Sequence, residues 1–123
     1  MGAGRRGDEG SVKLREVADT IVIDPRKLTE YALNPEHEAG KHKARVFESA
    51  LGYNPTNFHL LLDQIMALAL DAEMELMQIN ERGQFFRADL LIDGLAGQQV
   101  TVRTGWRLPP SSREARLTTL FVP

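Results

Sequence analysis

The hydrophobic residues of this chain change their spacing close to residue 75. Before this point apolar side chains recur every three or four residues, as they do along a helix that buries one face. After it they alternate with polar side chains, as they do along a strand that buries one face. A chain that places its helices first and its strands afterwards favours an α+β fold.

Three helical segments are predicted in the first part of the chain. Asp24 and Pro25 form a typical helix start, and this short helix ends before residues 34–35, which are Asn-Pro. A second helix is predicted over residues 39–51 and a third over residues 58–72, each with one apolar face. These helices would bury their apolar faces against the strands that follow.

Four strands are predicted in the second part of the chain. They cover residues 75–80, 85–93, 99–108 and 116–122, and turn residues separate them. In the third of these strands, Val102 and Trp106 share one face, and Arg103 lies on the other. We therefore expect an α+β fold with two or three N-terminal helices packed on one face of a C-terminal four-stranded antiparallel meander sheet.

The chain has the length of one domain, 123 residues. Residues 1–18 are rich in glycine and charge, so we expect a flexible leader there and a single α+β domain over residues 19–123. The longest wholly apolar run, residues 65–70, is too short to span a bilayer, and residues 1–19 lack the apolar stretch of a secretory signal. These features, together with the absence of cysteine, predict a cytoplasmic protein that does not bind a membrane.

Charge is distributed unevenly along the chain. Residues 61–100 contain seven acidic residues and two arginines, whereas residues 101–123 contain four arginines and one acidic residue, Glu114. Arginine binds phosphate and carboxylate groups through two hydrogen bonds at once. The C-terminal arginines therefore indicate either an anion-binding strand or the solvated outer face of an ordinary strand.

Residues 40–43, Gly-Lys-His-Lys, open the second predicted helix. They place two cations and an imidazole at the end of a helix that already carries partial positive charge. A site that holds an anion accounts for this arrangement. The alternative is a solvated helix start, in which Lys43 extends along the core face to the rim and His42 lies on the surface.

Several classes of chemistry lack their motifs in this chain. The three histidines, His37, His42 and His59, do not have the spacing of helical metal ligands. No serine lies in a strand-to-helix elbow, and no glycine-rich phosphate loop follows a strand. The sequence therefore predicts neither a metal site nor a cofactor.

Acid–base chemistry assisted by cations remains. Cleavage of RNA without a metal ion needs a base for the 2′-hydroxyl proton, an acid for the leaving 5′ oxygen, and cations that stabilise the transition state. Histidine is the residue type suited to proton transfer near neutral pH, so His42 would be the general acid or base. The other predicted site residues are Lys43, Arg103 and Thr118 in catalysis, Lys41, Arg103 and Arg116 in phosphate binding, Thr104 and Thr119 as hydrogen-bond donors, and Trp106 as a stacking platform for a base.

Structural alternatives exist for these assignments. Trp106 has the spacing of a core residue, since it shares its strand face with Val102. Arg103 would form an ion pair with Asp89 if the two strands that carry them are neighbours. In that case both side chains stabilise the fold rather than bind a ligand.

The motif over residues 34–52, Asn-Pro-x-His-x-x-Gly-Lys-His-Lys-Ala-x-x-Phe-x-x-x-Leu-Gly, resembles the signature of an uncharacterised family of small bacterial domains, a domain of unknown function. Residues 102–106 and 116–119 resemble two further blocks of this family. Such domains resemble the C-terminal toxin modules of secreted bacterial proteins, and their order of elements is similar to the barnase, EndoU, colicin and RelE group of metal-independent ribonucleases. Residues 82–85 depart from the family, whose members often have Tyr-Gly at this hairpin.

The resemblance implies a toxin-type ribonuclease that needs no metal, with RNA as substrate and a cognate inhibitor as a possible partner. The alternative function is a non-catalytic module that binds a partner protein, such as an antitoxin, an adaptor or an accessory protein of a mobile element. The sequence leaves the oligomeric state open. The ribonuclease hypothesis depends on whether the start of the second helix and the strand that carries Arg103 meet at one cleft.

Overall fold

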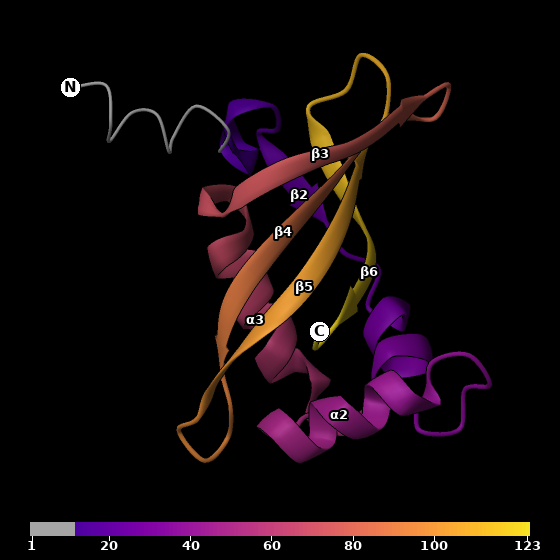
Figure 1. Cartoon of the computed structure of the whole chain (residues 1–123), viewed down its shortest axis with the longest axis vertical. Helices are drawn as coiled ribbons and strands as arrows, with labels where there is room; N and C mark the ends of the chain where they lie inside the picture. The colour runs from indigo at the N-terminus through magenta and orange to yellow at the C-terminus, as the bar shows by residue number, and fades with distance from the viewer. Residues whose placement is uncertain (1–11) are drawn as a thin grey trace.

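The computed structural model describes residues 12–123, which form a six-stranded sheet in the order β1-β3-β4-β5-β6-β2 (Figure 1). The strands are β1 (Val12–Lys13), β2 (Thr20–Val22), β3 (Glu73–Asn80), β4 (Gly83–Asp93), β5 (Gln99–Leu108) and β6 (Glu114–Phe121). Four of the five strand pairings are antiparallel, and the fifth, between β2 and β6, is parallel. The sheet is therefore mixed.

Two α-helices occur within the described residues, α2 (Lys41–Leu51) and α3 (Phe58–Leu68). Three short segments have other helical geometry. These are the 3₁₀ turns η1 (Leu14–Glu16) and η3 (Ala69–Asp71) and the π-helix η2 (Lys27–Ala32). Figure 1 shows α3 behind β4 and β5, and α2 at one end of the sheet.

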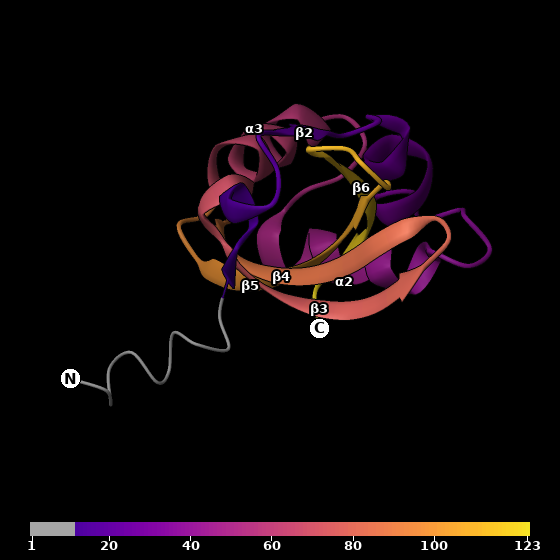
Figure 2. The same ribbon diagram turned by 90° about the horizontal axis from the view of Figure 1, so that it is seen from above.

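The sheet is strongly curled. Its two edge strands, β1 and β2, are neighbours in the chain and are separated only by residues 14–19. Six residues span at most roughly 20–25 Å, so the two edges must approach each other. In the view from above, β4 and β2 lie on opposite sides of the molecule with β6 between them (Figure 2). The concave side of the sheet thus encloses the core.

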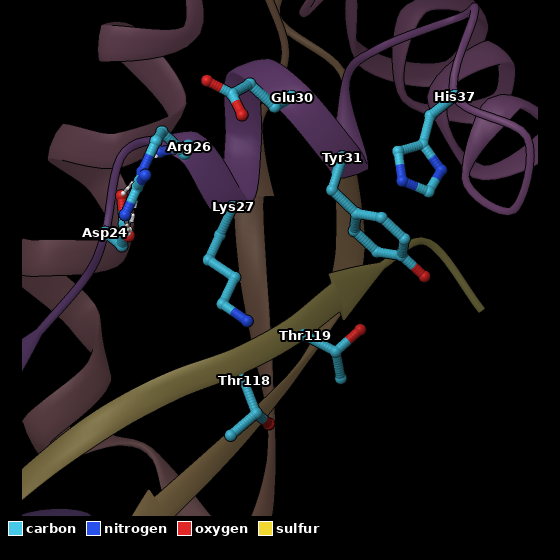
Figure 3. A pocket seen from close by; sticks show the side chains of 8 residues that line it. All are labelled: Asp24, Arg26, Lys27, Glu30, Tyr31, His37, Thr118 and Thr119. Atoms are coloured by element: carbon cyan, nitrogen blue, oxygen red, sulfur yellow. Dashed lines mark hydrogen bonds and ion pairs between the residues drawn. The ribbon is translucent and has the colours of Figure 1, made fainter.

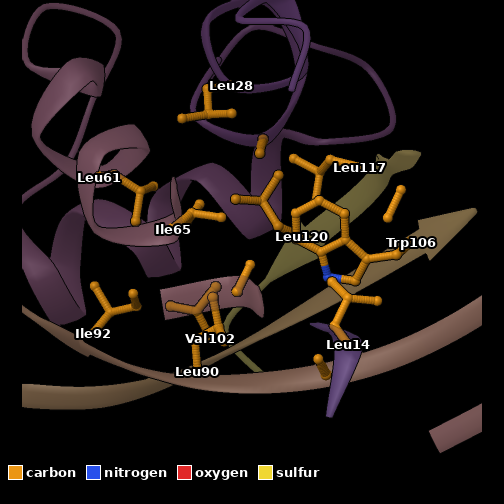
Figure 4. Close-up of a cluster of buried hydrophobic side chains, with 14 of the residues drawn as sticks. Leu14, Leu28, Leu61, Ile65, Leu90, Ile92, Val102, Trp106, Leu117 and Leu120 are labelled. Carbon is orange, nitrogen blue, oxygen red and sulfur yellow. The ribbon is translucent and has the colours of Figure 1, made fainter. Parts of the chain in front are cut away.

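The core lies between the concave side of the sheet and α3 (Figure 4). Alternation along β5 buries Val102, Thr104 and Trp106, and it leaves Arg103 partly exposed. Leu61 and Ile65, four residues apart on α3, are fully buried and point toward these strands. The face of β5 that the sequence assigns to the core is therefore the buried face.

The predicted arrangement of helices on one face of a four-stranded antiparallel sheet is wrong. The structure has a six-stranded mixed sheet that curls around the core, and only two segments are α-helices. The extra strands, β1 and β2, are two and three residues long, too short for alternation to reveal them. The first predicted helix is instead the six-residue π-helix η2.

The predicted leader over residues 1–18 divides into two parts. Residues 1–11 lie outside the described residues. In the other part, Val12 and Lys13 pair with β3, and Leu14 and Ala18 are completely buried in the core. Residues 12–18 therefore belong to the folded domain.

Candidate functional site

A cleft of about 550 Å³ lies between η2 and β6 (Figure 3). Its walls are formed by Asp24, Arg26, Lys27, Glu30, Tyr31, His37, Thr118 and Thr119. Most of these residues come from η2 and the turn before it, two come from β6, and His37 comes from the loop before α2. Segments far apart in the sequence thus form one polar cleft, which we call the η2–β6 cleft.

The π-helix η2 separates polar side chains from apolar ones. Leu28 is buried in the core, whereas Lys27 and Tyr31 line the cleft. The amide of Leu33 donates to the carbonyl of Leu28 at 2.8 Å, which closes a wider turn than that of an α-helix. Turns of this kind are rare and occur frequently at functional sites.

A β-bulge presents two consecutive threonines to the cleft, although neighbours on a strand normally face opposite sides. Gly105 on β5 pairs with Thr119. The next residue, Trp106, pairs with Leu117, which leaves Thr118 as the extra residue of the bulge. A Cβ atom at Gly105 would lie 2.9 Å from Oγ1 of Thr118, so glycine makes room for this arrangement. The bulge therefore places two hydroxyl groups on one wall.

Of the two carboxylates that line the cleft, Asp24 is already engaged. Nη2 of Arg26 lies 2.7 Å from Oδ2 of Asp24, and Nε of Arg26 donates to the same carboxylate. The hydrogen bonds from the Arg26 side chain and amide lower the pKa of Asp24 to about 2. Asp24 is therefore ionised at neutral pH and has no proton to donate.

Glu30 and Lys27 are the other charged groups of η2 in the cleft. Among the described residues, neither the Glu30 carboxylate nor the Lys27 ammonium group forms an ion pair. Figure 3 shows the Lys27 side chain extending from η2 toward Thr118 and Thr119. One acceptor and one cation thus remain available to a ligand.

Lys43 reaches the wall of the cleft from the first turn of α2. Its ammonium group donates to Oη of Tyr31 at 3.3 Å and lies over the ring of Phe121 at 4.7 Å. Because Oη of Tyr31 accepts this hydrogen bond, its own hydrogen is free to be donated into the cleft. Lys43 therefore joins the start of α2 to η2 and β6, whereas the sequence predicted that this helix start would meet the strand that carries Arg103.

His37 is held by the backbone that precedes α2. Its Nδ1 atom accepts hydrogen bonds from the amides of Ala39 and Gly40, both at 3.0 Å. This assigns the ring hydrogen of the neutral imidazole to Nε2. The ring also packs edge-on against Tyr31, with 4.9 Å between the ring centroids. His37 therefore offers an N–H donor in a fixed orientation.

A second, smaller hollow of about 220 Å³ adjoins the cleft. It is lined by Val22, Asp24, Lys27, Arg82, Arg107, Arg116, Leu117 and Thr118. Asp24, Lys27 and Thr118 line both hollows, so the two share a wall. We call the second hollow the arginine pocket.

The structure brings only some of the predicted site residues together. Thr118 lies in the cleft, Lys43 contacts its wall, and Arg116 lies in the arginine pocket. His42, by contrast, is exposed on α2, and neither His42 nor Lys41 is among the residues that line either hollow. The imidazole at the cleft is thus His37 and not His42.

Arg103 forms an ion pair with Asp89 across two strands, as in the structural alternative. Nε and Nη2 of Arg103 donate to the two carboxylate oxygens at 2.9 and 3.1 Å. These hydrogen bonds lower the pKa of Asp89 and raise the pKa of Arg103. Arg103 is therefore occupied by a partner within the sheet and is not among the residues that line either hollow.

Trp106 and Thr104, predicted to contact a ligand, lie in the core and are both completely buried. The indole N–H of Trp106 donates to Oγ1 of Thr104 at 2.8 Å, and the Thr104 hydroxyl donates to the carbonyl of Ala88 at 2.6 Å. The indole is therefore covered on both faces and is not available to stack on a base in this conformation. This is the core placement that the spacing with Val102 also allowed.

Sequence reasoning did not identify Lys27, Glu30, Tyr31 and His37 as a group. The sequence gives Tyr31 no role in a site, and it places His37 only among the candidate metal ligands and in the motif over residues 34–52. The spacing of Lys27, Glu30 and Tyr31 could have grouped them, because residues three and four positions apart share one face of a helix. Their proximity to β6 is non-local and has no sequence signal of its own.

Two kinds of feature are absent from residues 12–123. No three His, Asp or Glu side chains of these residues gather in a group that could hold a metal ion. No helix in the same part of the chain is long and apolar enough to cross a membrane. The cytoplasmic location stays a prediction from the sequence.

Comparison with known protein families identifies a match over most of the chain. The model of a family described as "Domain of unknown function (DUF6883)" matches residues 13–123, almost the whole chain. No curated protein and no solved structure matches the chain.

Proposed function

The chain belongs to the DUF6883 family, and we propose that this member binds the phosphodiester backbone of RNA in the η2–β6 cleft. The proposal is carried by one observation, the hydrogen-bond donors on both walls of the cleft. The donors are the Lys27 ammonium group, the Tyr31 hydroxyl, Nε2–H of His37, and the hydroxyls of Thr118 and Thr119. Phosphate oxygens are acceptors only, so this set of groups matches them in chemistry and charge.

Preference for RNA over DNA would come from Glu30. Its carboxylate is an acceptor without a partner among the described residues, and the 2′-hydroxyl of a ribose can donate to it. Asp24 does not compete for this role, because Arg26 already binds its carboxylate through both oxygens. A deoxyribose lacks the donor and would leave Glu30 facing the strand without a hydrogen bond.

Cleavage of the bound strand is the second step that we propose, because a base and an acid line the same cleft. Glu30 would take the proton from the 2′-hydroxyl, and the 2′ oxygen would attack phosphorus. The bond from phosphorus to the 5′ oxygen would break as Tyr31 gives that oxygen its proton. Lys43, which donates to Oη of Tyr31, would stabilise the resulting phenolate. The products are a 2′,3′-cyclic phosphate and a 5′-hydroxyl end.

This proposal retains the predicted reaction but changes its residues. Glu30 and Tyr31 take the proton-transfer roles that the sequence assigned to His42. Thr118 keeps a place beside the substrate, and Lys43 acts through its hydrogen bond to Tyr31. The alternative of a non-catalytic module for a partner protein stays a prediction and requires the absence of turnover.

Binding is tested with an RNA oligonucleotide made non-cleavable by 2′-O-methyl groups, measured by fluorescence anisotropy. Lys27→Ala should weaken binding about tenfold, since one charge-assisted contact to phosphate is lost. Arg45→Ala is the matched control, because Arg45 is an exposed cation on α2 that lines neither hollow. Equal affinities of the wild type and Lys27→Ala would contradict the proposal.

Cleavage is tested with unmodified RNA in the presence of EDTA. Glu30→Gln and Tyr31→Phe should each lower the rate by about 100-fold or more, and the cyclic phosphate should be found among the products. Glu38→Gln, in an exposed glutamate outside the cleft, is the control for Glu30→Gln. Loss of activity in His42→Ala with full activity in Glu30→Gln would restore the sequence-based assignment. Cleavage that is equal in all variants would indicate a contaminant and overturn the proposed reaction.

A further inference from the structure

We propose that the arginine pocket binds the next phosphate of the same RNA strand, so that the domain holds two consecutive phosphates. This inference rests on the proposed function, because the first phosphate is the one placed in the η2–β6 cleft. It goes further in assigning a second site, with Arg82, Arg107 and Arg116 as its cations. The ligand class is thus a single strand with at least two adjacent phosphodiester groups.

The register of the sheet places two arginines directly opposite each other. Arg107 on β5 pairs with Arg116 on β6. Like charges at opposing positions of neighbouring strands destabilise a sheet unless an anion offsets them. A phosphate bound in this pocket would offset the repulsion between the two guanidinium groups.

Carboxylates of the fold offset only part of this charge. Arg116 forms an exposed ion pair with Glu114 at 3.0 Å. Arg107 donates to the backbone carbonyl of Arg82 at 3.0 Å, and the guanidinium group of Arg82 lies over the ring of Phe85. Among the described residues, no carboxylate is paired with Arg82 or Arg107.

Contacts with neutral groups also hold these two arginines in place. The carbonyl of Arg82 orients the Arg107 guanidinium group, and the ring of Phe85 supports that of Arg82. Neither contact removes positive charge from the pocket. The guanidinium groups therefore lose less conformational freedom when they bind a phosphate through paired hydrogen bonds.

The two hollows adjoin each other, which favours one strand over two separate ions. Lys27 and Thr118 line both of them and would lie between the two phosphates. Asp24 also lines both and carries negative charge, but Arg26 binds its carboxylate through both oxygens. A strand can therefore pass from the cleft to the arginine pocket along the residues that both hollows share, whose unpaired charge is the Lys27 cation.

The experiment compares non-cleavable RNA oligonucleotides that contain one, two and three phosphates, measured by anisotropy over a series of salt concentrations. The wild type should bind the two-phosphate oligonucleotide at least about tenfold more tightly than the one-phosphate oligonucleotide. The slope of log affinity against log salt should be steeper by about 0.7 for the additional phosphate. Inorganic phosphate is included as a competitor that lacks the strand.

The variant is Arg107→Gln combined with Arg116→Gln, and Arg45→Gln is the control on α2. The double variant should bind the one-phosphate oligonucleotide like the wild type but lose both the affinity gain and the steeper slope. Thermal unfolding of each variant checks that the fold is intact.

The possible results distinguish failure of the second phosphate site from failure of the cleft itself. Normal binding of the one-phosphate oligonucleotide without a gain from the second phosphate would overturn this inference and leave the cleft intact. A gain that persists in the double variant would also overturn it. Inorganic phosphate that competes as well as the two-phosphate oligonucleotide would show a site for free anions and reject the strand. If no oligonucleotide binds, both proposals fail.

Discussion

Among the glycines of residues 12–123, Gly83 has the least room for a side chain. Its φ is +121°, and a Cβ atom there would lie 2.1 Å from the carbonyl oxygen of Leu108. Gly97 also has a positive φ, +88°, but nothing lies within 4 Å of its Cβ position. Gly83→Ala should therefore lower the free energy of unfolding by at least about 3 kcal/mol, and Gly97→Ala by about 1–2 kcal/mol. Urea denaturation measures both, and equal losses would contradict the contact with Leu108.

The pair of Asp24 and Arg26 gives a prediction about pH. The pKa of Asp24 in the folded protein is about 2, below the value of about 3.9 in an unfolded chain. Stability from this pair is therefore present above pH 4 and is lost as pH falls toward 2. The carboxyl carbon of Asp24, followed by NMR, should titrate near pH 2 in the wild type and at a higher pH in Arg26→Ala, in which the remaining amide hydrogen bond still keeps the pKa below about 3.9. A wild-type midpoint near pH 4 would show that the ion pair does not form.

At the scale of elements, Gln64 attaches α3 to the end of β4. Its Nε2 atom donates to Oη of Tyr53 at 2.7 Å and to the carbonyl of Asp93 at 3.0 Å, and its Oε1 atom accepts from the amide of Asp93 at 2.8 Å. Tyr53 is buried, and burial raises the pKa of its hydroxyl. Loss of these hydrogen bonds leaves the hydroxyl without one of its partners.

Gln64→Ala should lower the free energy of unfolding by about 1–3 kcal/mol. Gln78→Ala, in an exposed glutamine of β3, should change it by less than about 0.5 kcal/mol. In a double-mutant cycle with Tyr53→Phe, the two changes should be coupled by about 0.5 kcal/mol or more, because they share a hydrogen bond. Chemical denaturation of the four proteins measures this coupling, and strict additivity would reject it.

The long elements could be predicted because each has its own periodicity. Strands β3 to β6 begin and end within two residues of the positions that alternation indicates, and α2 ends at the predicted Leu51. The bulge at Thr118 could not be predicted, since it depends on the register against Gly105 on another strand. The same limit applies to the site: Lys43 could be recognised within its motif, whereas its contact with Tyr31 depends on the packing of α2 against η2.

At the scale of the whole molecule, residues 12–22 decide the topology. They supply both edges of the sheet, with β1 antiparallel to β3 and β2 parallel to β6. The pairing of β2 with β6 joins residues more than 90 positions apart, and no local pattern reports a contact of that range. This explains why local periodicity indicated a four-stranded sheet with helices on one face. The curled six-stranded sheet could not be predicted, because its edge strands are set by contacts distant in the sequence.

We infer that the curl of the sheet depends on Leu14, which is completely buried in the core and lies in the segment that connects β1 and β2. Its amide donates to the carbonyl of Ala72 at 3.1 Å, and the amide of Asp19 donates to the carbonyl of Arg113 at 2.7 Å at the other edge. Leu14→Ala should lower the free energy of unfolding by about 2–5 kcal/mol. Leu91→Ala, in a leucine that is 57% exposed on β4, should change it by less than about 0.5 kcal/mol.

Hydrogen exchange shows whether the two edges open together. If residues 14–19 hold the curled sheet closed, loss of the Leu14 side chain frees β1 and β2 in the same event, because this segment connects them. Exchange in Leu14→Ala should then accelerate by a similar factor for amides of β2 and of β3, although β2 lies at the far edge of the sheet. Faster exchange confined to β1 and β3 would mean that the edges open independently and that pairing with β6 alone holds β2 in place.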